Sequence, residues 1–364
     1  MKIGIVGAGA MGVGIAINCA INGHSVLLTD ISNETLTRAI NRYQDFVARQ
    51  VDKGRLSNSE AKAALTRLGR SDALSELAPC EIVIEAVSEN LPLKRQLFQE
   101  LQNIVSGKCV LASNTSCLKL SDIAGVLKEK SRFCGLHYFN PAEINPVVEL
   151  VATTETAART LETMRAFLQS TKKTTIECKD EHGFALNRFF VPYCNEAARC
   201  LDEGLATAGQ IDQVAREIFQ ASFGPFAVMN IVKTDIMLHA MRSLATLGPF
   251  YAEADGLERM GAGAQPWPIE DQPDHLPDPV AREIAHRLRG ALLLPVAELL
   301  ANDIASLEDI GLGAQLAFRM NRTPEDMLTG AGRTDALADV IALCERYGHL
   351  SPEMSFSTSS EAAT

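Results

Sequence analysis

The first twelve residues, Met1-Lys-Ile-Gly-Ile-Val6-Gly7-Ala-Gly9-Ala-Met-Gly12, decide the fold class of this chain. The apolar run 2–6 is typical of a buried strand, and the glycine pattern that follows it opens a helical pattern. In that context the first glycine permits a tight turn, the second lets a pyrophosphate approach the backbone, and the third lets helix and strand pack closely. The start of the helix supplies N–H groups and a partial positive charge. The stretch therefore predicts a dinucleotide site at Gly7, Gly9, Ala10, Met11 and Gly12.

Asp30 follows the second apolar run, 25–29, and stands eighteen residues after Gly12. A carboxylate at the end of the second strand binds the hydroxyls of an adenosine ribose and repels a 2′-phosphate. The turn and this carboxylate together predict NAD rather than NADP as the cofactor. A glycine turn that holds no ligand, with Asp30 as a helix cap, is the alternative.

Short apolar runs alternate with helical patterns through the first half of the chain, which is typical of a mostly parallel sheet covered by helices. We predict strands at 2–6, 25–29, 81–85, 109–112, 133–137, 147–151 and 174–177. The polar stretch 33–68 has helical spacing and breaks near Lys53-Gly54, which indicates a hairpin of two helices. The predicted fold class is a Rossmann-type, doubly wound α/β sheet followed by two all-α domains.

The all-α part begins near Gly183, where strand signals end and apolar residues recur at helical spacing. An internal repeat with an offset of 99 residues relates two segments of this part. Asn187-Arg188 matches His286-Arg287, and the same offset relates 205–207 to 304–306, Ile211 to Ile310, Phe219 to Phe318 and Pro225 to Pro324. Chance similarity between two amphipathic helices is the alternative explanation.

The repeat and the proline distribution predict the domain boundaries. Residues 261–282 hold five of the fifteen prolines, which indicates an extended linker. We predict a dinucleotide domain over 1–179 with the helical hairpin 33–68 as an insert, a first helical domain over 180–260, the linker over 261–282, a second helical domain over 283–350 and a flexible tail over 351–364. We expect the two helical copies to pack face to face as an internal pseudo-dimer, so that any homo-oligomer uses another surface.

Composition excludes several classes of protein. The 364 residues are 46% hydrophobic and 22% charged, as in globular proteins, and the formal net charge is -11, which argues against nucleic acid as a partner. The sequence has neither a run of about 18 apolar residues nor a signal-peptide pattern, so we expect a cytoplasmic protein without a membrane partner. Nine cysteines without a C-x-x-C pair favour reduced buried thiols and no metal site.

A histidine and a glutamate flank a proline-rich loop in the segment 133–149. His137 ends one predicted strand, Glu149 lies within the next, and Pro141 and Pro146 exclude a helix between them. A carboxylate beside an imidazole fixes its tautomer and raises its proton affinity, which suits removal of a hydroxyl proton near neutral pH. A purely structural contact between the two side chains is equally compatible with this spacing. Ser116 is a candidate donor to the same substrate oxygen, or simply a turn residue at a strand end.

Several motifs in order resemble the L-3-hydroxyacyl-CoA dehydrogenase family: 7–12, Asp30, Glu85-Ala-Val-Ser-Glu89-Asn-Leu-Pro-Leu-Lys94, Ser113-Asn-Thr-Ser116, Leu136-His137-Tyr-Phe-Asn140-Pro and Gly183-Phe-Ala-Leu-Asn187-Arg188. The resemblance extends to about residue 255, and the repeated helical unit is similar to the tandem C-terminal domains of multifunctional fatty-acid oxidation proteins. It implies catalytic roles for His137, Glu149, Ser116 and Asn187. It also implies NAD contacts at Asn114, Ser116, Glu89, Lys94 and Asn140, and contacts between CoA and Ser116, Lys53 and Arg55, although a solvated charged turn is the alternative for the last two.

The chain departs from the family pattern in three places. Asp180-Glu-His182-Gly-Phe replaces the usual Asp-x-Pro-Gly-Phe, and 257–267 replaces a glycine-rich segment whose lysine reaches the cofactor, which puts that contact in doubt. His286 stands where the first copy has Asn187, so we expect the second copy to support the fold rather than the chemistry.

The resemblance implies reversible, NAD-dependent oxidation of an (S)-3-hydroxyacyl-CoA to the 3-oxoacyl-CoA. Two alternatives stay open. The same chemistry can act on a substrate carried by an acyl carrier protein or on a small free hydroxy acid, or the chain can be a catalytically silent NAD-binding or structural member of the family.

Overall fold

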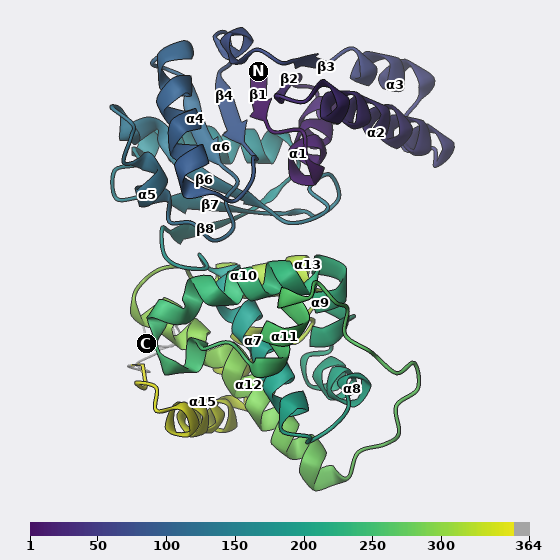
Figure 1. Ribbon diagram of the computed structural model, residues 1–364, viewed down its shortest axis with the longest axis vertical. Helices are drawn as coiled ribbons and strands as arrows, with labels where there is room; N and C mark the ends of the chain where they lie inside the picture. The colour runs from purple at the N-terminus through teal and green to yellow at the C-terminus, as the bar shows by residue number, and fades with distance from the viewer. Residues whose placement is uncertain (353–364) are drawn as a thin grey trace, which may run out of the picture. The chain divides into compact units, whose positions relative to one another are not determined.

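Strand β1 (Lys2–Val6), which starts the chain, lies inside an eight-stranded sheet with the order β3-β2-β1-β4-β5-β6-β7-β8. The other strands are β2 (Ser25–Thr29), β3 (Leu68–Ser71), β4 (Ile82–Glu85), β5 (Val110–Ser113), β6 (Phe133–Tyr138), β7 (Val147–Ala152) and β8 (Thr174–Lys179). All neighbouring strands run parallel except β6 and β7, which are antiparallel. The computed structural model describes residues 1–352, and the chain divides into two compact units, Met1–Asp180 and Glu181–Thr364 (Figure 1).

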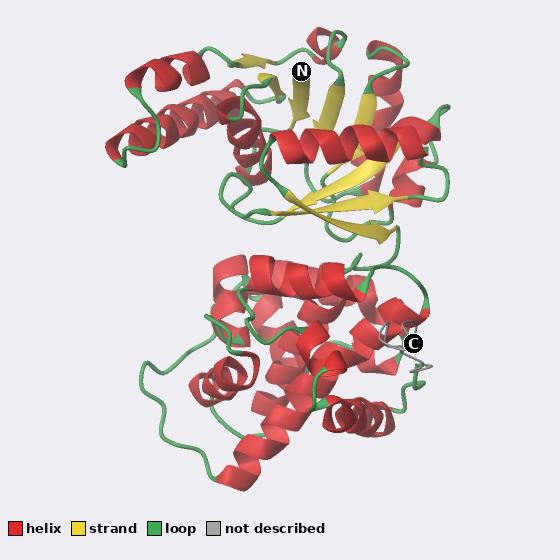
Figure 2. Cartoon of the chain, turned by 180° about the vertical axis from the view of Figure 1, so that it is seen from behind, coloured by secondary structure: helices red, strands yellow, loops and turns green. Residues whose placement is uncertain are grey.

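Helices cover both faces of this sheet. They are α1 (Ala10–Ile21), α2 (Asn33–Asp52), α3 (Asn58–Leu65), α4 (Leu91–Ile104), α5 (Leu120–Ala124) and α6 (Ala158–Ser170), with short 3-10 turns η1 (Leu74–Leu77) and η2 (Lys130–Arg132). One hydrophobic cluster joins α1, α2 and α6 to the sheet. Figure 2 shows α6 in front of the strands, with α4 on the far side, where Phe98 packs edge-on against Phe133 of β6 at 5.0 Å. This arrangement confirms the predicted doubly wound, mostly parallel fold.

The seven predicted strands are present, with ends that differ from the predicted ones by at most two residues. The predicted end of the helical hairpin at residue 68 is wrong, because α3 ends at Leu65 and Leu68–Ser71 pairs with β2 as an edge strand. Only the first and last residues of this short strand are buried. An edge strand of four residues whose two middle positions, Gly69 and Arg70, are both exposed carries too little alternation to be distinguished from the end of a helix.

The second unit is helical, as predicted. It contains α7 (Leu186–Asp202), α8 (Ala208–Phe219), α9 (Pro225–Val232), α10 (Thr234–Leu244), η3 (Ala245–Leu247), η4 (Pro249–Tyr251), α11 (Asp255–Ala262), α12 (Asp278–Ala301), α13 (Leu307–Phe318), α14 (Pro324–Thr329) and α15 (Arg333–Tyr347). The long helices α7 and α12 pack against each other (Figure 1). No helix within residues 1–352 is long and apolar enough to cross a membrane.

The elements of this unit repeat with the offset seen in the sequence. Helices α8 and α13 begin and end 99 residues apart, with Thr207 and Ser306 as their N-caps, and both end in a left-handed residue, Gln220 or Arg319. The turns after these helices contact each other: the N–H of Ser222 donates to the carbonyl of Arg319 at 3.2 Å, and the N–H of Asn321 donates to the carbonyl of Gln220 at 3.3 Å. These two hydrogen bonds exchange under the offset, which is the pattern of a two-fold contact.

The linker in the structure is shorter than the predicted 261–282. Helix α11 runs to Ala262, and α12 begins at Asp278. The prediction ended the linker too late, because a proline in the first turn of a helix loses no intrahelical hydrogen bond and so does not prevent α12 from starting there. Residues 263–277 contain no helix or strand. They are nevertheless attached, since the Trp267 ring packs on Phe226 at 4.9 Å and the backbone N–H of Trp267 donates to Oδ1 of Asn230 at 2.7 Å. Of the predicted flexible tail 351–364, residues 353–364 lie outside the described part of the chain.

Candidate active site

The glycine turn between β1 and α1 has the stereochemistry that its sequence predicts. Gly7 has a φ of +101°, and a Cβ there would lie 2.5 Å from the carbonyl oxygen of Ala86. A Cβ on Gly12 would lie 1.8 Å from the carbonyl oxygen of Gly7, whereas a Cβ on Gly9 would meet no atom of the described chain within 4 Å. Among residues 1–352 no side chain caps the N-terminus of α1. The turn is therefore closed to side chains on the protein side and open at Gly9, as binding of a pyrophosphate requires.

Asp30 lies beside this turn at the end of β2. Its Oδ2 accepts a hydrogen bond from the N–H of Ala8 at 2.8 Å, and its Oδ1 accepts one from the N–H of Ser32 at 2.9 Å. A carboxylate oxygen has two acceptor sites, so each oxygen keeps capacity for a ribose hydroxyl. The position fits the predicted preference for NAD.

A buried ion pair lies at the ends of the neighbouring strands β4 and β5. Glu85, with no exposed surface, accepts hydrogen bonds from Nζ of Lys94 at 2.6 Å, from Oγ of Ser113 at 2.6 Å and from the N–H of Val87 at 2.8 Å. These contacts give both carboxylate oxygens a partner, one of them a cation, which lowers the cost of burying the charge. Glu85 thereby holds Lys94, a residue to which the resemblance assigns a cofactor contact.

Glu89 organises the loop that carries Ser116. Its Oε1 accepts hydrogen bonds from Oγ1 of Thr115 at 2.5 Å and from the N–H groups of Ser116 and Cys117 at 3.0 Å each, and Nζ of Lys94 lies 3.3 Å from its Oε2. Burial alone would raise the pKa of Glu89, but the Lys94 ammonium and these hydrogen bonds outweigh burial and hold the pKa below its usual value. Glu89 is therefore ionised at neutral pH and fixes the backbone of Ser116.

His137 and Glu149 face each other across the one antiparallel step of the sheet. They are register partners in β6 and β7, and Nδ1 of His137 lies 2.5 Å from Oε2 of Glu149. The exposed fractions of the two side chains are 5% and 0%. Because β6 runs parallel to β5, His137 stands at the carboxyl ends of the strands, the edge at which doubly wound sheets bind their ligands.

The remaining predicted site residues fall at three places. Asn114 is buried and accepts a hydrogen bond at Oδ1 from the N–H of Tyr138 at 2.9 Å, which ties the Ser116 loop to the residue after His137. Asn140 is exposed in the loop after β6, and Lys53 and Arg55 lie on the exposed turn between α2 and α3. Asn187 is half-buried at the second position of α7, in the second unit.

The first unit thus gathers the glycine turn, Asp30, Glu89, Ser116 and the His137–Glu149 pair at the carboxyl ends of its parallel strands. The sequence interpretation missed the residues that hold this edge in place, namely Glu85, Thr115, Arg42, Glu143 and Lys173. The sequence signal for Glu85 was its own charge at the end of an apolar strand. Lys173, at the start of β8, and Arg42, inside an amphipathic helix, had no local signal.

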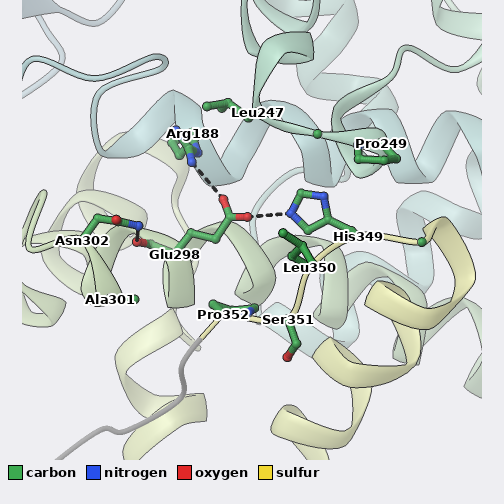
Figure 3. Close-up of a pocket in the computed structure, with 12 residues that line it drawn as sticks. Arg188, Leu247, Pro249, Glu298, Ala301, Asn302, His349, Leu350, Ser351 and Pro352 are labelled. Atoms are coloured by element: carbon green, nitrogen blue, oxygen red, sulfur yellow. Dashed lines mark hydrogen bonds and ion pairs between the residues drawn. The ribbon is translucent and has the colours of Figure 1, made fainter.

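A cavity of about 580 Å³ lies within the second unit and is lined by residues of that unit alone. Figure 3 shows Glu298 between Arg188 and His349: Nη2 of Arg188 donates to Oε2 of Glu298 at 2.9 Å, and Nε2 of His349 lies 2.7 Å from Oε1. Asn302 and Leu247 also line the cavity, and the repeat offset relates them to Glu203 and Arg346. Those two residues form an ion pair beside Arg287 in the other half of the repeat. In the repeat, the cavity therefore lies at the position equivalent to the salt bridge between Glu203 and Arg346.

Comparisons with known proteins match these features. Residues 2–181 match the model of the 3-hydroxyacyl-CoA dehydrogenase NAD binding domain, and residues 183–263 match that of the 3-hydroxyacyl-CoA dehydrogenase C-terminal domain. A probable 3-hydroxybutyryl-CoA dehydrogenase of Bacillus subtilis is 34% identical over 67% of this chain and 85% of its own length. The mitochondrial hydroxyacyl-coenzyme A dehydrogenase of Rattus norvegicus is 35% identical over 64% of this chain and 76% of its own length.

Two solved structures are similar as well. The (S)-3-hydroxybutyryl-CoA dehydrogenase PaaH1 of Ralstonia eutropha is 34% identical, with a TM-score of 0.70 over 72% of this chain and 93% of that chain. The 3-hydroxybutyryl-CoA dehydrogenase of Escherichia coli K12 is 23% identical, with a TM-score of 0.87 over 99% of this chain and 97% of that chain. The second structure shows that the fold of the whole chain, both helical copies included, occurs in another protein.

Proposed function

Because the chain belongs to the 3-hydroxyacyl-CoA dehydrogenase family and is an NAD-dependent enzyme of that type, we propose that it oxidises (S)-3-hydroxyacyl-CoA reversibly to 3-oxoacyl-CoA with His137 as the base. The observation that carries this proposal is the buried 2.5 Å contact between Nδ1 of His137 and Oε2 of Glu149 at the ligand-binding edge of the sheet. The contact supports a tautomer with its proton on Nδ1, which makes Nε2 the basic nitrogen. His137 then takes the proton of the substrate hydroxyl at Nε2, and Glu149 stabilises the imidazolium that results.

NAD, when bound, supplies the acceptor for the hydride that leaves C3 of the substrate. The residues that would hold it are the turn 7–12, Asp30, Glu89, Lys94, Asn114 and Asn140. The open approach at Gly9 and the free acceptor capacity of Asp30 support this assignment. The ion pair of Glu89 with Lys94 contributes by fixing the loop that carries Ser116.

Ser116 and Asn187 are the polar groups to which we assign orientation of the substrate oxygen. Glu89 accepts a hydrogen bond from the N–H of Ser116, and Asn114 accepts one from the N–H of Tyr138, which supports a fixed position for the Ser116 hydroxyl. Lys53 and Arg55 are the cations we assign to the CoA phosphates. His286, the counterpart of Asn187 in the second copy, has a side chain that is 54% exposed, and its Nδ1 lies 2.7 Å from Oδ1 of Asp339. The exposed imidazole of His286 and its contact with Asp339 support a structural role for the second copy.

The base is tested by replacing His137 with glutamine. We expect turnover to fall by roughly 10² to 10⁴, the usual contribution of a positioned acid or base, while NADH affinity is retained. His24→Gln is the matched control, because His24 is also a buried histidine of the first unit with a hydrogen-bonded ring, 2.9 Å from Oγ of Ser170. Parent-like turnover in the His137 variant would show that the assigned role is wrong.

The substrate class is tested by NADH absorbance with 3-hydroxybutyryl groups carried on CoA, on an acyl carrier protein and as the free acid. We expect the CoA thioester to give the highest kcat/KM. Replacing Lys53 and Arg55 together by alanine should raise KM for the CoA thioester and leave that for the free acid unchanged. Lys62→Ala, at another exposed position of the hairpin, is the control. A KM that does not respond to the double substitution excludes these two cations from CoA binding.

We also propose that the two helical copies form an internal pseudo-dimer. The exchanged backbone hydrogen bonds between the turns 219–222 and 319–322 support it. So do two ion pairs that cross between the copies, from Arg188 to Glu298 and from Arg287 to Glu196, because the two arginines are related by the offset of 99. Each copy thereby buries a face that it would otherwise expose.

A further inference from the structure

The loop 139–146 joins β6 to β7. His137 precedes it and Glu149 follows it, so its conformation bears on where these two residues meet. Inside the loop the N–H groups of Ile144 and Asn145 donate to the carbonyl of Pro141 at 2.9 and 2.8 Å. These bonds shape the loop but do not attach it to the rest of the unit.

Lys173 attaches the loop from the side of β8. Its Nζ donates to the carbonyls of Ala142 and Asn145 at 2.6 Å each and lies over the ring of Tyr138, 5.8 Å from the ring centroid. The residue is 8% exposed, and burial lowers its pKa to about 8. A buried ammonium is costly, so the contact serves to hold these two carbonyls rather than to add stability.

Arg42 of α2 attaches the loop from the other side. Its Nη2 donates to Oε1 of Glu143 at 2.6 Å, and its Nη1 donates to the carbonyl of Ala10 at 3.1 Å. One guanidinium therefore contacts both the loop that follows His137 and the glycine turn of the nucleotide site. The planar fork of arginine suits this double contact, which the point charge of lysine would reproduce only in part.

Because Glu143 is buried, the stability of its charge depends on the contact with Arg42 more than the charge of an exposed carboxylate would. Its side chain is 7% exposed, and no described residue donates a hydrogen bond to its Oε2. That oxygen packs against Gly14 of α1, where a Cβ would lie 2.6 Å from it. A buried carboxylate with one unsatisfied oxygen relies on nearby cations, here Arg42 by direct contact and the Lys173 ammonium by longer-range attraction. A displacement of the glycine turn or of α2 would therefore act on the loop through the contacts of Arg42 with Ala10 and Glu143.

We propose that Arg42 and Glu143 are positioning residues that couple the dinucleotide turn to the loop 139–146 and so to the His137–Glu149 pair. This proposal rests on the proposed function, because that function defines the reaction that the His137–Glu149 pair performs. Occupancy of the turn by the cofactor would then stabilise the catalytic geometry before the acyl substrate binds. A misplacement of about 1 Å at a reacting group is enough to lower a rate by about 100-fold.

Hydrogen exchange of the full chain tests the coupling without any substrate. In the parent, NADH should slow exchange of the amides of the turn 7–12 and of the loop 139–146. In Arg42→Met, NADH should still protect the turn, whereas protection of the loop should fall by at least about fivefold. Arg38→Met is the matched control, because Arg38 lies one turn earlier on α2 and its ion pair with Glu34 is exposed. Equal loop protection in the parent and in Arg42→Met would overturn the proposal.

Steady-state kinetics test the consequence for catalysis. Arg42→Met and the isosteric Glu143→Gln should each lower kcat by about 10- to 100-fold, with NADH affinity changed by less than about threefold. Arg42→Lys should restore part of the loss, and the double variant should be no worse than either single variant, because both remove one contact. Weaker NADH binding with an unchanged kcat would overturn the proposal and make Arg42 a cofactor-binding residue only.

Gly14→Ala displaces the loop without touching Arg42, because a Cβ there would lie 2.6 Å from Oε2 of Glu143 and 3.1 Å from Cβ of Ala142. It adds a methyl group against Oε2 without changing charge, and alanine favours a helix, so α1 should fold. We expect the same fall in kcat and the same loss of loop protection, and parent-like values of both would overturn the proposal. If the parent itself turns over none of the thioester or free-acid substrates, the proposed function fails, whereas the exchange experiment still decides the coupling.

Discussion

Replacing Arg287 with methionine removes the cation at the centre of the contact between α12 and α7. The Arg287 side chain is 5% exposed, and its Nε donates to Oε1 of Glu196 at 2.7 Å. Its Nη1 and Nη2 donate to the two oxygens of Glu203 at 2.6 and 3.0 Å. Methionine keeps an unbranched apolar stem, so the change deletes the charge and the hydrogen bonds with little loss of packing.

The expected loss of stability comes mainly from Glu196. That carboxylate has no exposed surface, and removing one partner of a buried ion pair costs about 3 to 5 kcal/mol. Nη1 of Arg199 at 3.2 Å and the hydroxyl of Tyr347 at 2.9 Å still contact Glu196, which favours the lower end of that range. Glu203 is 40% exposed and adds between 0 and about 1 kcal/mol. We expect a decrease of about 3 kcal/mol in the free energy of unfolding of the second unit.

The single tryptophan makes this unit separately observable. Trp267 is buried in the second unit against Phe226, so its fluorescence in urea reports unfolding there. Arg242→Met is the matched control: Arg242 also contacts two carboxylates, those of Glu253 and Glu258, but its side chain is 47% exposed. The control should lose no more than about 1 kcal/mol.

A second substitution separates the loss of a charge partner from the loss of packing. Arg287→Met combined with Glu196→Gln removes the uncompensated charge and should recover part of the lost stability. If Arg287→Met loses no more than Arg242→Met, or if the double variant is no more stable than Arg287→Met alone, the reasoning about buried charge at this contact is refuted.

Three further outcomes follow from the structure. Binding titrations should show NAD(H) tighter than NADP(H) by at least about tenfold, or ~1.4 kcal/mol, because Asp30 repels a 2′-phosphate, and equal affinities would contradict this. Truncation after residue 265 should expose the apolar face of the first helical copy and give a dimer or an aggregate by hydrodynamic measurement, whereas a soluble monomer with unchanged activity would rule out the internal pseudo-dimer. Burial lowers the pKa of Lys173 to about 8 from 10.5, so the free energy of unfolding of the parent relative to Lys173→Met should increase as pH rises from 8 to 10.5, and a difference that does not vary with pH would contradict the burial effect.

The local chemistry of the chain was enough to predict the α/β fold class and the nucleotide turn. An apolar run followed by Gly7, Gly9 and Gly12 favours one backbone conformation, a tight turn from strand to helix. A Cβ at the first or third glycine would overlap a carbonyl oxygen in this turn. The alternation of short apolar runs with helical patterns then specified seven of the eight strands. The repeat offset identified two related helical segments, since equal spacing of caps and prolines survives in the sequence. The turn, the strands and the pattern within each copy of the repeat depend on residues that are close together along the chain.

The eighth strand, the ends of the linker and the supports of the catalytic edge were decided by tertiary structure. Leu68–Ser71 is a strand because β2 offers it an edge, not because of its own pattern. The sequence placed His137 and Glu149 on either side of a turn, but their register required the antiparallel step between β6 and β7.

Arg42 and Glu143 are 101 residues apart, and Lys173 lies 31 residues from the carbonyl of Ala142 that it binds. No local pattern marks such partners, because their pairing is created by the packing of α2, β8 and the loop 139–146 around a common edge. Hydrophobic periodicity reports which face of an element is buried, whereas the pairing of buried charges depends on which elements meet. That is why the nucleotide turn was predicted from sequence and the network behind the catalytic pair was visible only in the folded chain.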